Sequence, residues 1–475
     1  MSVSTQIAEF VADADEGIPE PALQAASRSV LDAIGVSLGA SGLGEGCGAF
    51  LRLARASDGS GPCRILGTSV RVGPPLAALV NGAFAHALDY EDAHDLAMVH
   101  PNAAPVAAAL AVAQHLDATD QRYTISGRRF LAAIAVGADL VCRLGLLLTR
   151  AADSRGWYPP PILGAIGAAA TAANLLGLSP DAVRSAISLV TCQATCFGEL
   201  KRSPLSVVRA VRDAFGAQGA VIAALLAADG VTGFEQPFEG EAGIAALYGG
   251  ESMDAAALLD GLGERFHGTD VSFKPWPSCR GTHAFIDAAL GLRLEVAAQP
   301  IASVHLVGGS ANRMLFEPRE QKVAPQTAID AKFSLPFTVA TALVRGRVGL
   351  ADFDEAARTD ADVLGLAGRV TDEVDDRASS GAEWGKVTVK LRSGRELSRI
   401  VDDPPGSPRR PIPDSALIEK FVQCACWAAE PLDAETAQGF ADRLLALPET
   451  DDAVRALEAP QSLDGRRSES ERGFS

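Results

Sequence analysis

Apolar and polar residues alternate with a helical period over most of the N-terminal half of the chain. Apolar side chains recur at positions i, i+3, i+4 and i+7, the spacing of one buried helix face. This pattern predicts helices at residues 4–16, 20–40, 74–88, 101–116, 125–150, 161–176, 180–197 and 204–229. Short turns separate these segments, without strand-like alternation between them. We therefore predict an all-α helical domain over residues 1–268.

The pattern changes after Thr269 and predicts a mixed α+β domain over residues 269–408. An extended, proline-broken stretch opens this part, and two strand-like runs around a Ser-Gly turn at 386–401 predict a β-hairpin. The other predicted elements are a helix at 280–296, a strand at 301–309 and a helix at 327–345.

A proline-rich linker leads from the mixed part to the C-terminal end of the chain. Helical periodicity returns within residues 409–460. The segment 461–475 is polar, and we expect it to be a disordered tail.

Composition and charge narrow the class of protein. A hydrophobic content of 48% with 21% charged residues is typical of a globular protein with a large core. The net charge of −17 argues against nucleic acid or an anionic membrane surface as a partner. The most apolar segment, Pro161 to Leu178, is rich in Gly and Ala and contains Thr171 and Asn174, so we expect a buried helix and no membrane span.

The N-terminus and the cysteines bear on the compartment. The first residues lack a basic region followed by an apolar core, so we expect no signal peptide. Eight scattered cysteines in a chain of 475 residues do not resemble a disulfide framework. We therefore predict a protein of the reducing cytoplasm.

A polar cluster interrupts this apolar background at HALDYEDAHDLAMVHP, residues 86–101. It holds three of the seven histidines and four acidic residues, and nearly uncharged sequence lies on both sides. Charged groups are expensive to bury without partners or a function. The cluster is either a capped polar turn between helices or part of a functional site.

Two further clusters lie in the second half of the chain. FKPWPSCRGTHAFIDAAL, residues 273–290, places cations at the start of a predicted helix, a typical anion-binding arrangement. Asp330 and Lys332 precede a strongly apolar helix. Taken alone, each cluster is equally well explained by helix capping and surface charge.

Together, and in this order, the clusters resemble the MmgE/PrpD family, which includes 2-methylcitrate dehydratases, cis-aconitate decarboxylases and iminodisuccinate epimerases. The other matching stretches are GWYPPPILGAIGAAATAA, AADGVTGFEQPFEGEAGI and DAKFSLPFTVATAL. The resemblance implies that the C-terminal helices return to the helical domain and that the α+β part between them is a lid. It also implies a homodimer, and a site at the domain junction without metal or organic cofactor.

The family's functional positions match this chain only in part. The resemblance implies that Asp89, His100 and Lys274 are catalytic. It implies substrate binding by Arg280, His283, Tyr158, Arg209 and Cys279. The family lysine near position 208 has no clear equivalent, and Arg209 or Arg212 can replace it. Where decarboxylase-like relatives carry threonine, histidine, histidine and tyrosine, this chain has Ala93, Tyr158, Cys279 and Phe337.

These residues suggest chemistry that begins with removal of a proton α to a carboxylate or carbonyl. Asp89 and His100 would form the acid/base pair, and Lys274, Arg280 and Arg209 would bind carboxylates. We predict a cofactor-independent hydro-lyase acting on a hydroxylated, small-molecule carboxylic acid. An isomerase or epimerase, a decarboxylase of a small dicarboxylate and an inactive ligand-binding homologue are the alternatives. We expect no metal, because His86, His94 and His100 lack a recognised metal-binding spacing.

Overall fold

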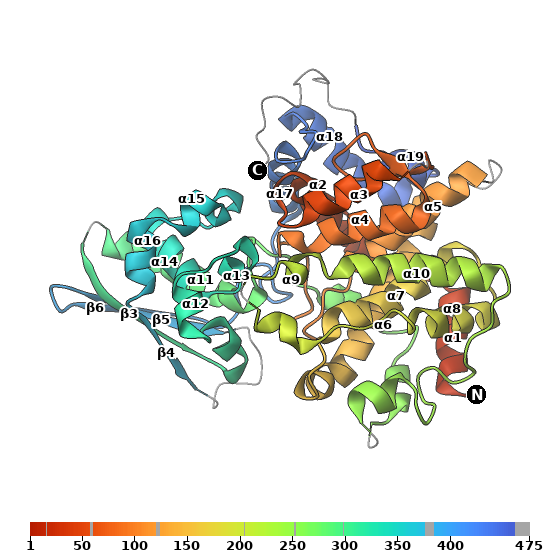
Figure 1. Cartoon of the computed structure of the whole chain (residues 1–475), viewed down its shortest axis with the longest axis horizontal. Helices are drawn as coiled ribbons and strands as arrows, with labels where there is room; N and C mark the ends of the chain where they lie inside the picture. Colours follow the sequence, from red (N-terminus) through yellow and green to blue (C-terminus); the bar gives the residue numbers. More distant parts are fainter. Residues whose placement is uncertain are drawn as a thin grey trace.

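Two parts of different composition make up the molecule, a large helical part and a smaller part that contains a four-stranded sheet (Figure 1). The computed structural model describes residues 1–15, 17–57, 60–119, 124–203, 205–250, 253–297, 299–375 and 384–460. The predicted tail at 461–475 lies outside the described residues.

The helical part is built around one central apolar helix, α7. Its elements are α1 (Val3–Asp13), α2 (Glu20–Leu43), α3 (Cys47–Ala56), β1 (Cys63–Arg64), β2 (Arg71–Val72), α4 (Pro74–Ala87), α5 (Ala103–Thr119), α6 (Gly127–Ser154), α7 (Pro159–Leu175), α8 (Pro180–Val190), α9 (Val208–Val211) and α10 (Asp213–Ala228). Helix α7 is buried along its whole length between α5, α6, α8 and α10. The predicted buried helix in this region is therefore confirmed.

Small side chains let these helices approach closely. A Cβ atom on Gly167 of α7 would lie 2.2 Å from the Val141 side chain of α6, and one on Gly137 of α6 would lie 1.9 Å from Thr171. Two helical stretches, Gly127–Ser154 and Val208–Ala228, are long and apolar enough to cross a membrane. Their apolar windows are 89% and 72% buried inside the protein, which is how core helices are placed.

The sheet-bearing part has a mixed sheet with strand order β4-β3-β5-β6. The strands are β3 (Ile301–Gly308), β4 (Val370–Val374), β5 (Gly385–Leu391) and β6 (Glu396–Val401). Only β3 and β4 run parallel, and the predicted hairpin is confirmed as the antiparallel pair β5–β6. Its helices are α11 (His283–Val296), α12 (Arg319–Val323), α13 (Ala328–Lys332), α14 (Leu335–Arg345), α15 (Glu355–Arg358) and α16 (Ala361–Ala367). Helix α11 packs on β5 and β6 and separates them from α14.

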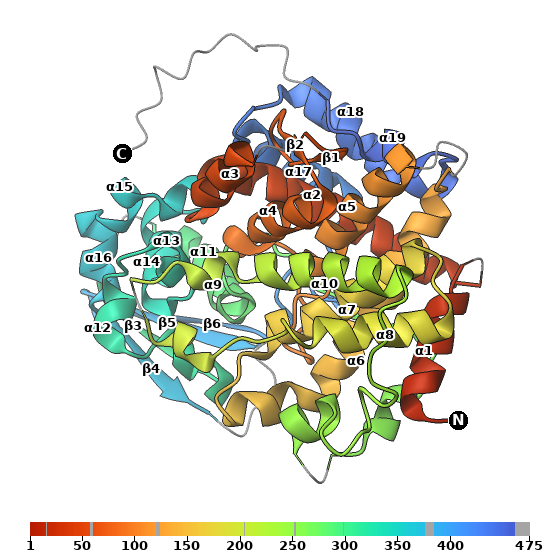
Figure 2. The ribbon, with the colours of Figure 1, turned by 45° about the vertical axis from the view of Figure 1, so that its right-hand side comes forward.

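The last three helices return to the helical part, where the first two lie beside α2 and the third packs on α5 (Figure 2). They are α17 (Asp414–Cys426), α18 (Ala434–Leu445) and α19 (Ala453–Leu457). Glycines on α2 make room for α17, because a Cβ on Gly35 would lie 2.7 Å from the Phe421 ring. Segments from both ends of the chain thus share one helical core.

Several predicted boundaries were wrong, each for a local reason. Helix α2 extends to Leu43 into the glycine-rich stretch, and helix α3, which the sequence did not predict, begins at Cys47 after a short turn. The helix expected at 180–197 ends at Val190, and the following residues turn so that Cys196 accepts a hydrogen bond from Tyr158. The helix expected at 327–345 is two helices, because Ser334 caps a new one that has Pro336 in its first turn.

Candidate active site

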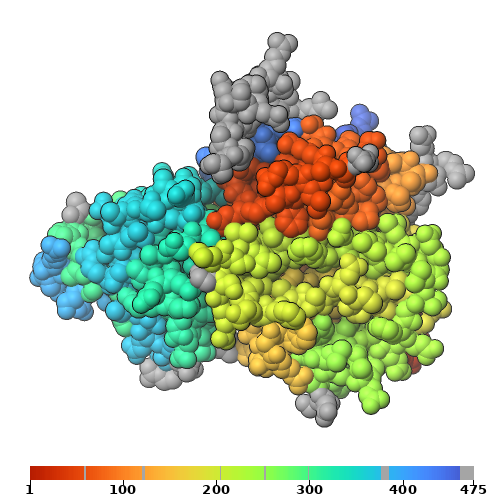
Figure 3. All heavy atoms as spheres, viewed as in Figure 1, coloured from red at the N-terminus to blue at the C-terminus, as the bar shows by residue number. Residues whose placement is uncertain are grey.

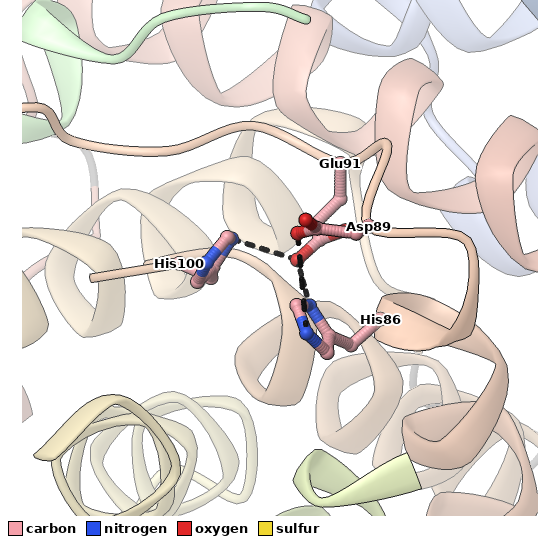
Figure 4. Close-up of side chains that lie close together, drawn as sticks. All are labelled: His86, Asp89, Glu91 and His100. Carbon is pink, nitrogen blue, oxygen red and sulfur yellow. Dashed lines mark hydrogen bonds and ion pairs between the residues drawn. The ribbon is translucent and has the colours of Figure 1, made fainter. Parts of the chain in front are cut away.

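The loop that follows α4 carries the first half of the site, and its course depends on Asp89. This residue has a backbone φ of 47°, a left-handed conformation that few residues other than glycine and asparagine adopt readily. The conformation turns the chain sharply at the end of α4, and His86 lies in the last turn of that helix. The turn brings Asp89 and Glu91 next to His86 and His100 (Figure 4).

Lys274 joins this loop to the extended segment that precedes α11. Its ammonium lies 2.7 Å from Oδ1 of Asp89 and donates a second hydrogen bond to the Asp89 carbonyl at 3.0 Å. Both side chains are almost completely buried. The structure therefore brings together two of the three residues that the sequence predicted as catalytic.

Both members of this pair are charged at neutral pH. Burial acts to raise the pKa of Asp89, but the Lys274 ammonium and the nearby imidazoles outweigh it and lower that pKa to about 2. Burial acts to lower the pKa of Lys274, but Asp89 and Glu91 outweigh it and raise that pKa. An ionised Asp89 is a poor proton donor, and its contacts hold the Lys274 ammonium in place.

Glu91 connects the two histidines of the cluster. Its Oε1 atom meets Nδ1 of His86 and lies 2.7 Å from Nδ1 of His100. Burial acts to raise the pKa of Glu91, but the imidazoles and Lys274 lower it well below its usual value. Because an ionised carboxylate only accepts hydrogen bonds, each histidine carries its proton on Nδ1 and donates it to Glu91.

Arg212 reaches the cluster from the start of α10 and fixes His86 from the other side. Its Nη1 group donates to Nε2 of His86, and both residues are buried. Burial and the positive charge of Arg212 lower the pKa of His86, so that this imidazole is neutral. His86 is thus fully engaged in positioning Glu91 and Arg212.

His100 differs from the other three residues in the cluster because its side chain is 15% exposed. Its Nδ1 faces Glu91 and the carbonyl of Asp92, which lies 3.1 Å away. Within the described residues Nε2 has no hydrogen-bond partner, and its lone pair is available. A carboxylate that orients an imidazole whose other nitrogen is free is the arrangement of a general base.

Two buried guanidinium groups, those of Arg209 and Arg212, lie near the Tyr158 ring, and Arg212 contacts the cluster through His86. Arg209 stacks on the Phe333 ring, with its Cζ 3.3 Å from the ring centroid, and the Tyr158 ring lies 5.8 Å from Arg209 and 5.0 Å from Arg212. Nε and Nη2 of both arginines are buried without a hydrogen-bond partner in the part of the chain that the structure describes. Nε of Arg212 also lies 3.5 Å from Oδ2 of Asp213, in a buried ion pair. Buried donors without a hydrogen-bond partner suit the carboxylates of a substrate.

Cys279 and Lys332 complete the surroundings of the arginines. Burial raises the pKa of the Cys279 thiol to about 11, so this cysteine is protonated and no nucleophile. The sequence allows Lys332 to be a solvated surface charge, but the structure shows that it is buried. Burial lowers the pKa of Lys332 to about 7. Its Nζ donates to the carbonyl of Pro277 at 3.0 Å.

Arg280 and His283, predicted to bind substrate, are engaged within the protein. Arg280 forms an ion pair with Asp95 at 3.1 Å and donates to the carbonyl of Pro405. Nε2 of His283 donates to the carbonyl of Ser278 at 3.2 Å, and burial and Arg280 hold the pKa of His283 well below its usual value. These contacts fix the segment that carries Lys274, and their role toward substrate stays a prediction.

Two groups of residues have the composition of a metal site. The ligand atoms of His86, Asp89, Glu91 and His100 lie within 4.8 Å of one another, but Lys274 and Arg212 already place positive charge against this group. In the group of His94, His267 and Asp270, Nδ1 of His94 accepts from the backbone of Ala97, so its proton is on Nε2. Both arrangements favour the predicted metal-free site.

Three important residues were not among the predicted site residues. Glu91 and His86 stood in the polar cluster, but nothing in the sequence showed which of four acids meets which histidine. Arg212 was only an alternative to Arg209, and the structure gives both arginines a place at the site. The three-residue spacing of Arg209 and Arg212 on a helix was the available signal.

The fold and the site together define a two-part, mostly helical protein with a buried cluster of carboxylates, histidines and cations. Comparison with protein families gives the same class. The MmgE/PrpD N-terminal domain model matches residues 5–255, and the MmgE/PrpD C-terminal domain model matches residues 276–444. The chain belongs to the MmgE/PrpD family, and the resemblance found in the sequence is confirmed.

Curated relatives of this chain are named as decarboxylases. The cis-aconitate decarboxylase-like protein oryM of Aspergillus oryzae is 28% identical over 93% of each chain. A cis-aconitate decarboxylase of Aspergillus terreus is 25% identical and covers 96% of this chain and 95% of its own. The human cis-aconitate decarboxylase is 26% identical over 74% of this chain and 73% of its own.

Proposed function

We propose that this protein is a cofactor-independent lyase that eliminates water from a hydroxylated carboxylic acid. The observation that carries the proposal is His100, whose Nδ1 is held by Glu91 while Nε2 is free. Arg212, which has buried donors without a hydrogen-bond partner, contacts the same cluster through His86. A base and a carboxylate site that are linked through one cluster match the first step, removal of a proton α to a carboxylate.

The charged groups of the site suit the rest of the elimination. Nε2 of His100 takes the α-proton, and the electrons of the C–H bond form the C=C bond as the C–O bond to the neighbouring hydroxyl breaks. Arg209 and Arg212 stabilise the negative charge that develops on the carboxylate. The Lys274 ammonium, kept charged by Asp89, or the newly formed imidazolium of His100 donates the proton that converts the departing hydroxide into water.

Decarboxylation is the second candidate, and the names of the relatives, cis-aconitate decarboxylases and a protein like them, favour it. In that reaction the C–C bond to a carboxylate breaks, CO₂ leaves, and a protonated His100 supplies the proton that takes its place. Ala93, Cys279 and Phe337 depart from the pattern of decarboxylase-like relatives, and for that reason we place elimination first.

One experiment separates these reactions. The purified protein is incubated in heavy water with a panel of hydroxy acids and unsaturated di- and tricarboxylic acids, and mass and proton spectra are recorded. Loss or gain of water supports the hydro-lyase, and release of CO₂ supports the decarboxylase. Deuterium exchange or inversion without a change of composition indicates an isomerase or epimerase. Thermal stabilisation by an acid without turnover indicates a ligand-binding homologue.

The wider organisation that we propose follows the same family. The sheet-bearing part, residues 269–408, acts as a lid over the site, and residues 1–268 together with 409–460 form the body. The protein is a homodimer of the cytoplasm whose partner molecule is the acid substrate. The catalytic groups all come from the chain itself, without metal or cofactor.

A further inference from the structure

A second buried lysine lies directly behind the Asp89–Lys274 pair, on a helix from the other end of the chain. Lys420 is on α17, and its side chain reaches the backbone on which the pair is built. Its ammonium donates to the carbonyl of Tyr90 at 2.6 Å and to the carbonyl of Lys274 at 3.1 Å. The two acceptors therefore belong to the neighbour of Asp89 and to Lys274 itself.

The remaining contacts of Lys420 are also internal. It forms an ion pair with Asp32 of α2 at 2.6 Å, and its Nζ lies 4.0 Å from the centroid of the Tyr90 ring. Lys420 is 6% exposed and Asp32 is 4% exposed. A buried ion pair is a poor source of net stability, because both charges lose their hydration. The position of the Lys420–Asp32 ion pair therefore says more about its role than its contribution to stability does.

The geometry shows what this position controls. Three segments that are remote in sequence, those of Asp32, Tyr90 and Lys274, meet at the single ammonium of Lys420. The hydroxyl of Tyr90 donates to the carbonyl of Pro275 at 3.1 Å, which adds a second link between the same two segments. Helix α17 therefore fixes the distance between the backbone next to Asp89 and the backbone of Lys274.

We propose that Lys420 is a positioning residue of the site, which holds the backbones of Tyr90 and Lys274 so that Asp89 and Lys274 meet. The C-terminal helix α17 is then part of the catalytic apparatus, although none of its side chains needs to touch the substrate. This proposal rests on the proposed function only in treating the Asp89–Lys274 pair as part of the active site.

The test is a double-mutant cycle between Asp89→Asn and Lys274→Met, measured in two backgrounds by the shift of the denaturant midpoint. The first background is the natural sequence, and the second is the double variant Asp32→Asn/Lys420→Met. This variant removes the clamp without leaving a buried carboxylate unpaired, so that it keeps its fold. We expect the coupling between Asp89 and Lys274 to fall to less than about half in the second background.

Phe421→Leu is the matched control, because Phe421 is the next residue on α17 and is fully buried against Phe440. It weakens the packing of the helix but leaves the three contacts of Lys420 in place. We expect the full Asp89–Lys274 coupling in this variant. If the coupling in Asp32→Asn/Lys420→Met equals that in the natural sequence, or if the natural sequence shows no coupling at all, the proposal is wrong.

A kinetic measurement adds a readout that simple loss of stability does not change. With an acid that the protein turns over, Asp32→Asn/Lys420→Met should lower kcat by about tenfold or more, with a smaller change in KM, because misplacement of catalytic groups acts on the transition state. Phe421→Leu should leave kcat unchanged while the protein is folded. Failure of every acid in the panel would contradict the proposed function, and the coupling measurement would still decide the role of Lys420.

Discussion

His100 has two acceptors at its Nδ1 atom, the carboxylate of Glu91 and the carbonyl of Asp92. This fixes the proton on Nδ1 and leaves the lone pair of Nε2 facing away from the cluster. His86 shares the same carboxylate, but Arg212 takes its second nitrogen. Two histidines bound to one carboxylate thus differ in their second nitrogen, and in the proposed mechanism one is the base and the other a support.

The first prediction concerns this base. His100→Gln should lower kcat by about 10²- to 10⁴-fold on the substrate found in the panel, because it removes proton transfer. The fold should persist, since His100 is the one member of the cluster that reaches the surface. The control is His305→Gln, at a half-exposed histidine on strand β3. A kcat within about threefold of wild type for His100→Gln would assign the base elsewhere.

The second prediction concerns Asp92, the buried neighbour of Glu91. Burial and the nearby Asp32 raise the pKa of Asp92 to about 7, against the partial opposition of Ser29 and Asn102. Between about pH 4 and pH 7 the folded state then binds a proton that the unfolded state has lost, so that stability falls as the pH rises.

Asp92→Asn removes this penalty. The stability of this variant relative to wild type should therefore increase by about 2–3 kcal/mol between pH 5 and pH 8. Urea unfolding at a series of pH values measures the difference. A relative stability that does not change over this range would show that Asp92 is ionised throughout.

At the scale of single residues, the sequence showed which charged and histidine residues stand out, but not which of them contact one another. Asp89, His100 and Lys274 stood out because charged groups interrupted nearly uncharged stretches. The choice of Glu91 among the acids, and of Arg212 as well as Arg209, depends on how helices α4 and α10 pack. The left-handed backbone of Asp89, which places the carboxylates, has no signature in a side-chain pattern.

At the scale of elements, the contact between α2 and α17 matters most for the proposed positioning of the site, because it brings Lys420 of α17 to Asp32 of α2. Glycines at positions 35, 39 and 42 line the face of α2 that meets α17. A Cβ on Gly42 would lie 2.1 Å from the carbonyl oxygen of Trp427, which is backbone and cannot rotate away.

The third prediction follows from this contact. Gly42→Ala should push the end of α17 outward and lower the free energy of unfolding by about 1–3 kcal/mol. Gly48→Ala on α3 is the control, because its Cβ would meet only the flexible end of Arg52 at 3.4 Å. That variant should be neutral or more stable by up to about 1 kcal/mol, through helix propensity. Equal Tm values for the two variants would contradict the close contact of α2 and α17.

Helices were predicted correctly where apolar residues recur with a helical period over several turns. Helices α2, α4, α6 and α7 have such periods and lie close to their expected ranges. Helix α3 was missed because the glycines in the turn before it, Gly44 and Gly46, hide where it begins, although the helix itself contains only one glycine. It packs against α4 and α2.

At the scale of the whole molecule, one face of the helical part carries exposed aromatic and aliphatic side chains. Helices α3 and α10 form the upper middle of the face seen in Figure 3. Phe215 of α10 is 53% exposed and lies edge-on to Phe50 of α3, and Leu53 is 54% exposed. Large exposed apolar side chains in one region are typical of a surface between subunits.

The fourth prediction tests the proposed homodimer at this face. Sedimentation velocity should give a dimer for the natural sequence and a monomer for Phe215→Glu, because a charge would be buried in the interface. Leu294→Glu is the control, on helix α11 of the sheet-bearing part, where the leucine is 85% exposed. A monomeric natural protein would contradict the homodimer, and a dimeric Phe215→Glu variant would place the interface on another face.

The order of helical and mixed segments along the chain could be predicted, but the pairing of the strands could not. A run of helices, a mixed segment and a return to helices were readable from residue patterns. The strand order β4-β3-β5-β6, with a parallel β3–β4 pair, was not, because pairing partners remote in sequence leave no periodic signal. The division into a body and a lid stays a prediction.

The return of α17 to α2 has a consequence for how this protein is made. Asp32 and Asp89 leave the ribosome well before Lys274, and Lys420 is the last of these four residues to emerge. Until α17 emerges, Asp32 lacks its counter-ion and the carbonyls of Tyr90 and Lys274 lack their shared donor. If Lys420 positions the pair as proposed, a nascent chain stalled before residue 414 would hold Asp89 and Lys274 unassembled, and the site would form only after α17 has left the ribosome.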